Sequence, residues 1–188
     1  MRRNALLVID MLNDFLDPAG ALYCGEGARR IIPVVRSLID SFEKAGDAVI
    51  YLRDAHAPND KEFEMFARHA VKGSWGSEII PELSPSETAA VVEKTRYDGF
   101  YGNDLDERIA RLDPKEVWVC GVVTSICVMD TVGELRNRDR AVVVPVGGVA
   151  DFDPYAHEFA LKRMTDIYGA GLVEPLPTRE DVRPLRAL

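Results

Sequence analysis

Cys127 stands at the start of a predicted helix, directly after a predicted buried strand. The strand is the apolar run 117–120, Gly121 ends it, and apolar residues on one face predict a helix over 125–135. The first turn of a helix has unpaired backbone N–H groups and the positive end of the helix dipole, and both favour a thiolate. A cysteine among apolar neighbours can equally be an inert part of the core. The surroundings of Cys127 therefore decide between a nucleophile and simple packing.

Other polar side chains fall at the ends of predicted strands. Asp10, Asp54 and Lys94 each close one of the first three strands, and Cys127 follows the fourth. Each residue alone can be a turn cap or a solvated charge. Ligands of parallel sheets bind beyond the carboxyl ends of the strands, so the four side chains are expected to converge on one edge of the sheet. Four such placements in succession favour a functional site.

Asp10, Lys94 and Cys127 form a coherent set for nucleophilic catalysis. A thiol near neutral pH needs a base that accepts its proton and a cation that stabilises the thiolate. Asp10 can be the base and Lys94 the cation, and the sulfur can then attack a carbonyl carbon. Backbone N–H groups at the strand–helix turn can stabilise the resulting oxyanion.

A second group of residues has the chemistry of a metal site. Asp54 and His56 are two apart on an extended segment, so both side chains can face one ion. His69 and the nearby Glu62 can complete a site with two histidines and carboxylates for a divalent transition metal, with Glu64 as an alternative to Glu62. The alternative is that these histidines are structural or surface residues.

Strands and helices alternate along the chain. Predicted strands cover 5–9, 48–52, 89–92, 117–120, 141–146 and 171–173, the last at an edge of the sheet. Predicted helices cover 28–45, 105–112, 125–135 and 153–167, and Asp104 or Asn103 caps the second of them. This order predicts one α/β domain over residues 1–188, with three α/β/α layers and a mainly parallel, Rossmann-like central sheet. The long irregular segment 55–88 is expected to be functional, and the tail after Pro175 is expected to lie on the surface or on a partner.

Composition excludes several classes of partner. The formal net charge of −8 makes nucleic acid and anionic membrane unfavourable partners. No apolar run approaches a membrane span, and the N-terminus does not resemble a signal peptide. The cysteines are three in number, without a C-x-x-C motif, which favours a reducing compartment and hence the cytoplasm.

The motifs together resemble the isochorismatase-like cysteine hydrolases, and among them the metal-containing nicotinamidases. The resemblance runs in order from about residue 5 to residue 174. It is carried by Leu7 to Phe15, Arg53 to His56, His69 to Glu78, Glu93 to Phe100 and Gly121 to Val128.

This resemblance implies roles for individual residues. Asp10, Lys94 and Cys127 match the family's catalytic triad. The Val122–Val123 bond matches a cis peptide that directs the N–H groups of Val123 and Cys127 into an oxyanion hole. The residues that match the metal ligands of nicotinamidases are Asp54, His56 and His69, with Glu62 as a fourth, and the metal is zinc, with iron or manganese open. The candidates for an apolar substrate pocket are Phe15, Leu22, Trp75, Tyr97 and Tyr101. Members of the family commonly form dimers or tetramers, so a homo-oligomer is expected.

The expected reaction is hydrolysis of a small carboxamide through a thioester on Cys127, with nicotinamide giving nicotinate and ammonia. Many nicotinamidases have Trp where Ala55 stands and Cys where Ala70 stands, so other substrates of the superfamily stay open. These are the amides of N-carbamoylsarcosine, ureidoacrylate and maleamate amidases; isochorismatases lack the Asp54–His56 pattern and are disfavoured. A non-catalytic binding member is the alternative from another class, and the complete triad argues against it.

Overall fold

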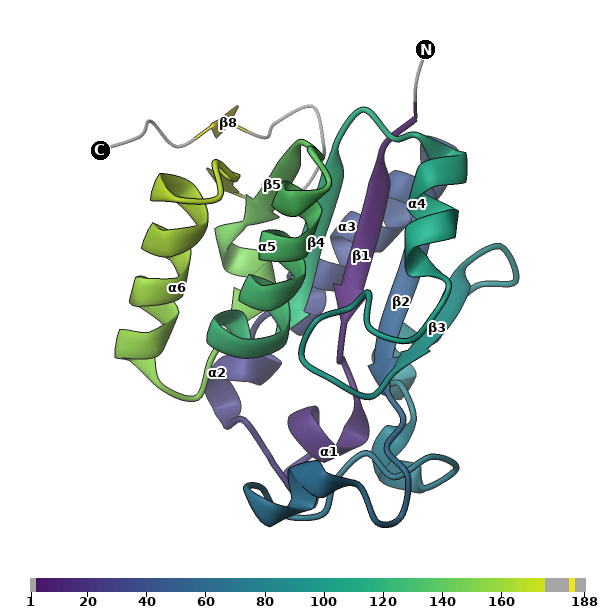
Figure 1. Ribbon diagram of the computed structural model, residues 1–188, viewed down its shortest axis with the longest axis vertical. Coiled ribbons are helices and arrows are strands. Elements are labelled where there is room, and N and C mark those ends of the chain that lie inside the picture. Colours follow the sequence, from purple (N-terminus) through teal and green to yellow (C-terminus); the bar gives the residue numbers. More distant parts are fainter. Residues whose placement is uncertain (1–2, 175–182, 185–188) are drawn as a thin grey trace.

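A mainly parallel sheet forms the centre of the computed structural model, which describes residues 3–174 and the pair Arg183–Pro184 (Figure 1). The strands follow one another across the sheet in the order β3-β2-β1-β4-β5-β7-β8, and β6 pairs with β4. Only the pairing of β7 with β8 is antiparallel among the described strands. The strands are β1 (Ala5–Ile9), β2 (Ala48–Asp54), β3 (Ala90–Lys94), β4 (Val117–Val122), β5 (Val142–Pro145), β6 (Val149–Ala150), β7 (Gly171–Glu174) and β8 (Arg183–Pro184).

Helices cover both faces of the sheet, which confirms the predicted three-layer α/β/α class. In Figure 1, α3 (Ile32–Lys44) lies behind the sheet, and α4 (Leu105–Leu112), α5 (Met129–Asn137) and α6 (Pro154–Asp166) lie in front of it. Strand β1 shows why both faces are covered, because all five of its residues are buried. Leu6 and Val8 pack in the core on the α3 side, and Leu7 and Ile9 pack on the opposite side. A continuous apolar run is the pattern of such a doubly covered strand.

The structure differs from the sequence-based expectation at several element boundaries. The predicted helix 28–45 is interrupted, with α2 (Glu26–Arg29) ending before α3 begins. Strand β7 is not the edge strand that was predicted, because β8 pairs with its outer side. The predicted helix 125–135 begins as a π-helical turn over Thr124–Val128 before α5. Apart from β8, the tail after Pro175 lies outside the described residues.

The segment 55–88 connects β2 to β3, and most of it lies at the lower edge in Figure 1, beyond the carboxyl ends of the strands. It contains three short 3₁₀ helices, Lys61–Glu64, Trp75–Ser77 and Pro81–Leu83. Residues Asn13–Leu16 form α1 at the same edge. The most irregular part of the chain therefore surrounds the strand ends where the polar residues converge.

None of the helices in the described part of the chain is both long enough and apolar enough to cross a membrane.

Gly121 is expected to be essential for the packing of β4 against β1. Its φ is +116°, and a Cβ placed there would lie 2.0 Å from the backbone oxygen of Ile9. Gly121→Ala should therefore lower the free energy of unfolding by about 2 kcal/mol or more, measured by urea denaturation. The matched control is Gly27→Ala in α2, where a Cβ would meet no atom within 4 Å and alanine favours the helix. Equal stabilities of the two variants would contradict this account.

Candidate active site

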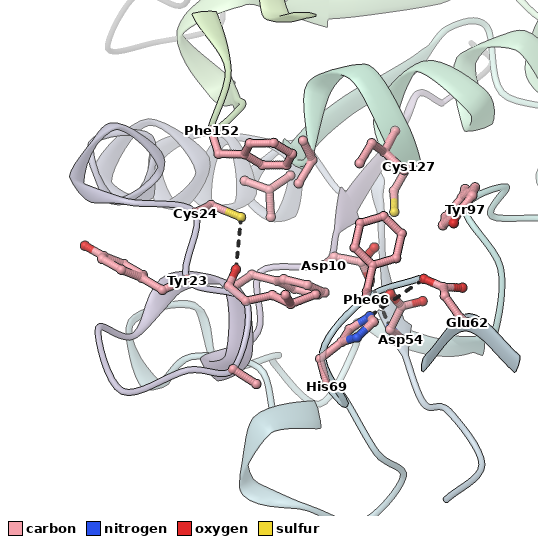
Figure 2. Close-up of a pocket in the computed structure, with 16 residues that line it drawn as sticks. Asp10, Tyr23, Cys24, Asp54, Glu62, Phe66, His69, Tyr97, Cys127 and Phe152 are labelled. Carbon is pink, nitrogen blue, oxygen red and sulfur yellow. Dashed lines mark hydrogen bonds and ion pairs between the residues drawn. The ribbon is translucent and has the colours of Figure 1, made fainter. Parts of the chain in front are cut away.

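The carboxyl ends of β1, β2 and β3 and the start of the turn after β4 bring four predicted residues together. Asp10 follows β1, Asp54 ends β2, Lys94 ends β3 and Cys127 lies in the π-helical turn after β4. Parallel pairing places Asp54 directly beside Lys94 in the register of the sheet. Facing atoms of Asp10, Asp54 and Cys127 lie within 4.8 Å of one another, and Figure 2 shows these three side chains at one end of a pocket.

Lys94 is the centre of this cluster, and its side chain is fully buried. Its Nζ lies 2.7 Å from Oδ2 of Asp10 and 2.6 Å from Oδ1 of Asp54. It also donates to the carbonyl oxygen of Arg96 at 3.2 Å and lies 3.5 Å from Sγ of Cys127. A buried ammonium is stable only with such compensation. Burial works against the ammonium, but the two carboxylates raise the pKa of Lys94 well above its usual value.

Asp10 is held in a defined orientation beside the thiol. Its Oδ1 accepts the backbone N–H of Asp54 at 2.9 Å, and its carboxylate lies within 4.8 Å of the sulfur of Cys127. The φ of Asp10 is +50°, in the left-handed region that residues other than glycine rarely adopt. Such backbone outliers concentrate at functional sites.

The pKa values of Asp10 and Cys127 indicate a protonated thiol beside an ionised carboxylate. Burial, together with the charge of Asp54, raises the pKa of Asp10 to about 6, so its carboxylate is ionised at neutral pH. Burial also raises the pKa of Cys127 well above its usual value, although Lys94 works in the other direction. The expectation that the helix start favours a resting thiolate is therefore wrong here, because burial outweighs the dipole. Asp10 can instead take the proton when the sulfur attacks.

The turn after β4 places Cys127 and the candidate oxyanion donors. The peptide bond between Val122 and Val123 is cis. The N–H of Val128 then donates to the carbonyl of Val123 at 3.2 Å, which closes the π-helical turn around Cys127. Neighbouring elements brace this turn, since Oδ2 of Asp151 accepts the N–H of Ser125 at 2.9 Å. The N–H groups of Val123 and Cys127 remain the proposed oxyanion donors.

The predicted metal ligands form a second buried cluster that shares Asp54 with the first. Ligand atoms of Asp54, His56 and His69 all lie within 4.8 Å of one another. The Nδ1 of His69 is 2.8 Å from the carbonyl of Ala67, and its Nε2 lies 3.7 Å from Oε1 of Glu62. Glu62 is buried and faces this cluster, whereas Glu64 is exposed. The geometry therefore favours Glu62 over Glu64 as the fourth ligand.

These residues fit a divalent transition metal. The Nε2 of His56 is buried, lies 3.6 Å from Oδ2 of Asp54, and has no hydrogen-bond partner among the described residues. A buried nitrogen without a partner is costly unless a ligand binds it. The carboxylates of Asp10, Asp54 and Glu62 also face only one fully buried cation, Lys94. A divalent cation would satisfy the nitrogen and balance the excess negative charge.

A cavity of about 510 Å³ joins the two clusters. Of the five residues expected in the pocket, Phe15, Leu22 and Tyr97 line it. The expectation is wrong for Trp75 and Tyr101, which are 49% and 59% exposed and do not line the cavity. The carbonyl oxygen of Trp75 accepts from the side chain of Asn13 at 2.9 Å. The ring of Tyr101 lies against the guanidinium of Arg96.

Several further residues that line the cavity were not predicted from the sequence. Phe66 lines it near the candidate metal ligands, and its ring meets that of His69 edge-on. Tyr23, Cys24 and Phe152 lie on the other side of the pocket from Glu62 and His69 (Figure 2). Phe66 is one of three phenylalanines whose rings contact that of His69, together with Phe15 and Phe63. Its position three residues before His69 is the one signal that could have identified it.

Comparison with known proteins identifies the family. The model of the isochorismatase domain matches residues 4–173. An uncharacterized isochorismatase family protein, PncA of Bacillus subtilis (strain 168), is 32% identical over an alignment of 182 positions, covering 92% of this chain and 100% of the relative. A probable inactive nicotinamidase of Arabidopsis thaliana is 30% identical, covering 88% of this chain and 90% of the relative. A ureidoacrylate amidohydrolase, RutB of Acinetobacter baylyi, is 29% identical, covering 69% of this chain and 63% of the relative.

Solved structures with the same fold come from several enzymes. The nicotinamidase/pyrazinamidase PncA from Bacillus subtilis superposes with a TM-score of 0.86 at 34% identity, covering 90% of this chain and 98% of that one. The pyrazinamidase of Pyrococcus horikoshii in complex with zinc has a TM-score of 0.86 at 31% identity, covering 92% and 99%. An N-carbamoylsarcosine amidase from Thermoplasma acidophilum has a TM-score of 0.83 at 33% identity, covering 95% and 97%.

The chain therefore belongs to the isochorismatase family. Its relatives and structural neighbours place it among the amidohydrolases of that family. They include proteins named for different amides, so they leave the substrate open.

Activity should depend on the ionised form of Asp10. Because the pKa of Asp10 is raised to about 6, the base is lost as the pH falls through this value. The value of kcat/KM, measured against pH, should therefore decrease on the acid side with an apparent pKa near 6. Asp10→Asn should lower kcat by about 1,000-fold or more, because the neutral amide cannot accept the thiol proton. A rate that stays level well below pH 6, or an active Asp10→Asn variant, would contradict this assignment.

Proposed function

We propose that this isochorismatase-family protein is a metal-dependent cysteine amidohydrolase that converts nicotinamide and water to nicotinate and ammonia. The observation that carries the proposal is the shared buried cluster, in which Asp54 contacts Lys94 through Oδ1 and faces His56 through Oδ2. A nucleophile and a candidate site for a ring nitrogen thereby line the same cavity.

The first half of the proposed reaction forms a thioester. The sulfur of Cys127 attacks the amide carbonyl carbon while Asp10 accepts the thiol proton. The carbonyl electron pair moves to oxygen, and the N–H groups of Val123 and Cys127 stabilise the oxyanion. Lys94, 2.7 Å from Asp10 and 3.5 Å from Cys127, keeps the carboxylate oriented and stabilises the developing thiolate. The oxyanion then collapses, the C–N bond breaks, and Asp10 returns the proton to the departing nitrogen as ammonia.

The second half of the reaction uses the same groups with water. Asp10 accepts a proton from the water as its oxygen attacks the thioester carbon. The C–S bond breaks, the carboxylic acid product forms, and the proton held by Asp10 returns to the sulfur of Cys127. Each group ends in its starting protonation state, so the cluster needs no further reactant.

Asp54, His56, Glu62 and His69 would hold the metal. When bound, a divalent ion such as Zn²⁺ supplies a Lewis-acid position for a ring nitrogen and for water. The residues around it orient the substrate, with Phe15 and Phe66 lining the cavity near His69. A homologous pyrazinamidase has been solved in complex with zinc, which supports this assignment.

The charge of the cavity favours a neutral amide over the other substrates of the family. N-carbamoylsarcosine, ureidoacrylate and maleamate each carry a carboxylate, which proteins usually pair with Arg or Lys. Among the described residues that line the cavity none is Arg or Lys, whereas Asp10, Asp54 and Glu62 all line it. An uncharged nicotinamide avoids repulsion by these groups, so it fits the cavity better than a carboxylate does.

The triad of Asp10, Lys94 and Cys127 supports an active enzyme rather than a non-catalytic binding protein of the family. One relative is a probable inactive nicotinamidase, so a non-catalytic role has to be considered. In this chain Asp10, Lys94 and Cys127 are all present and buried, and Nζ of Lys94 lies 2.7 Å from Asp10 and 3.5 Å from Cys127. A buried ion pair is weak evidence for stability alone, so a catalytic role is the better explanation of this arrangement.

Nicotinamide should be hydrolysed far better than benzamide, which has the same shape but no ring nitrogen. A site that binds a ring nitrogen rejects the analogue lacking it, so kcat/KM should differ by about 100-fold or more. Removal of the metal by a chelator should abolish this preference. Ammonia release from both amides, measured before and after chelation and after adding Zn²⁺ back, tests the expectation.

The control for this experiment is the rate at which a small alkylating agent modifies Cys127, which chelation should change much less than it changes nicotinamide turnover. Equal rates on the two amides would reject nicotinamide as the preferred substrate, and an active protein that contains no metal would reject the proposed role of the metal. Ammonia release from N-carbamoylsarcosine, ureidoacrylate or maleamate instead would identify another amidase of the family.

A further inference from the structure

Asp60 is a buried carboxylate that contacts the candidate metal ligands without belonging to them. It precedes the 3₁₀ helix Lys61–Glu64, and its Oδ1 accepts the backbone N–H of Glu62 at 3.0 Å. Its Oδ2 lies 3.2 Å from Nδ1 of His56, so the two oxygens contact two different members of the cluster. The side chain is only 7% exposed, which makes these contacts its main environment.

The contact with His56 determines which ring nitrogen faces the metal site. A neutral imidazole has one N–H, and the nitrogen opposite a hydrogen-bonding carboxylate keeps its lone pair. With Nδ1 directed at Asp60, the free nitrogen is Nε2, which is buried, unpaired and directed at Asp54. His69 is oriented differently, by the neutral carbonyl of Ala67. His56 is therefore the histidine of the pair whose ligand nitrogen is oriented by a charged group.

Arg96 connects Asp60 to the catalytic cluster. Its guanidinium lies 3.1 Å from both oxygens of Asp60, and its carbonyl oxygen accepts from Nζ of Lys94 at 3.2 Å. The Arg96 side chain is 43% exposed, so the ion pair of Arg96 and Asp60 connects the protein surface to the buried His56. Arg96 thus contacts Asp60, which lies beside the candidate metal ligands, and also Lys94 of the catalytic cluster.

We propose that Asp60 is a positioning residue for the metal site, which fixes the His56 ring with Nε2 towards the ion and holds Glu62 in place through its backbone. Arg96 keeps the Asp60 carboxylate in this orientation. The proposal rests on the metal site proposed above and assigns Asp60 no contact with substrate or with the ion. The alternative is that Asp60 only caps the 3₁₀ helix at residues 61–64.

Metal affinity separates these two roles. Apo-protein is prepared with a chelator, and the Kd for Zn²⁺ is measured by competition with a chromophoric chelator. Asp60→Ala should weaken Zn²⁺ binding by about 10-fold to 100-fold, the usual effect of losing a carboxylate that orients a ligand histidine. Asp60→Asn keeps a similar shape and a cap but loses the charge, and it should weaken binding by a smaller factor. Arg96→Ala should also fall between wild type and Asp60→Ala.

The matched control is Asp153→Ala. Asp153 is also an aspartate that caps a helix, accepting from the backbone N–H groups of Tyr155 and Ala156 at the start of α6. It contacts none of the candidate ligands, so this variant should lose a cap and keep the wild-type Kd. Thermal unfolding of each apo-protein shows whether a variant is folded, and Asp60→Asn tests the proposal if Asp60→Ala does not fold.

The outcomes of this experiment are distinct. Unchanged Zn²⁺ affinity in folded Asp60→Ala or Asp60→Asn, or equal weakening in Asp153→Ala, would reduce Asp60 to a helix cap and overturn the proposal. A wild-type protein that binds no Zn²⁺ would overturn the metal site itself, and with it the role of Asp60. Weaker binding in the Asp60 variants without activity on nicotinamide would support the role of Asp60 and reject only the substrate.

Discussion

The buried ammonium of Lys94 is the interaction on which the rest of the site depends. It lies within 2.7 Å of a carboxylate oxygen of Asp10 and within 2.6 Å of one of Asp54. Removing a lysine charge from water is costly, and only paired carboxylates with good geometry offset this cost. The three residues come from the ends of three adjacent strands, so the order β3-β2-β1 in the sheet is what makes the pairing possible.

Asp54 connects the catalytic and metal clusters because its two oxygens have different neighbours. One contacts Lys94, and the other faces the unpaired Nε2 of His56. The arrangement leaves more negative than positive charge in a buried volume, since Glu62 also faces this region. The same excess of charge therefore favours a bound cation and disfavours anionic substrates. The proposed substrate preference and the proposed metal binding then have a common electrostatic cause.

The strand ends could be predicted from the sequence, whereas the walls of the cavity could not. Continuous apolar runs ended by Asp10, Asp54 and Lys94 gave both the sheet and the convergence of these side chains, because parallel strands all end at one edge. Trp75 and Tyr101 were wrongly expected in the pocket because aromatic residues in the segment 55–88 and after β3 have no periodicity that fixes their direction. Phe66, Phe152 and Asp60 were missed for the same reason, since loop conformation places them.

The state of Cys127 shows a second limit of sequence-based prediction. A helix start is visible in the sequence and favours a thiolate, but the degree of burial is not visible. In the structure, burial raises the pKa of Cys127, so the thiol stays protonated until Asp10 accepts its proton. The resting cluster is therefore a protonated thiol and a carboxylate beside the Lys94 ammonium, and not a preformed ion pair of a cysteine thiolate with Lys94.

The most direct test of the account is a comparison of two cysteines in the same cavity. Cys24 also lines it, but burial raises the pKa of Cys24 to about 12 and its thiol donates to the carbonyl of Leu22 at 3.4 Å. The measurement is kcat/KM for ammonia release from nicotinamide by Cys127→Ser and Cys24→Ser. The account predicts a loss of about 1,000-fold or more in Cys127→Ser and activity near wild type in Cys24→Ser. Substantial activity in Cys127→Ser, or its loss in folded Cys24→Ser alone, would contradict it.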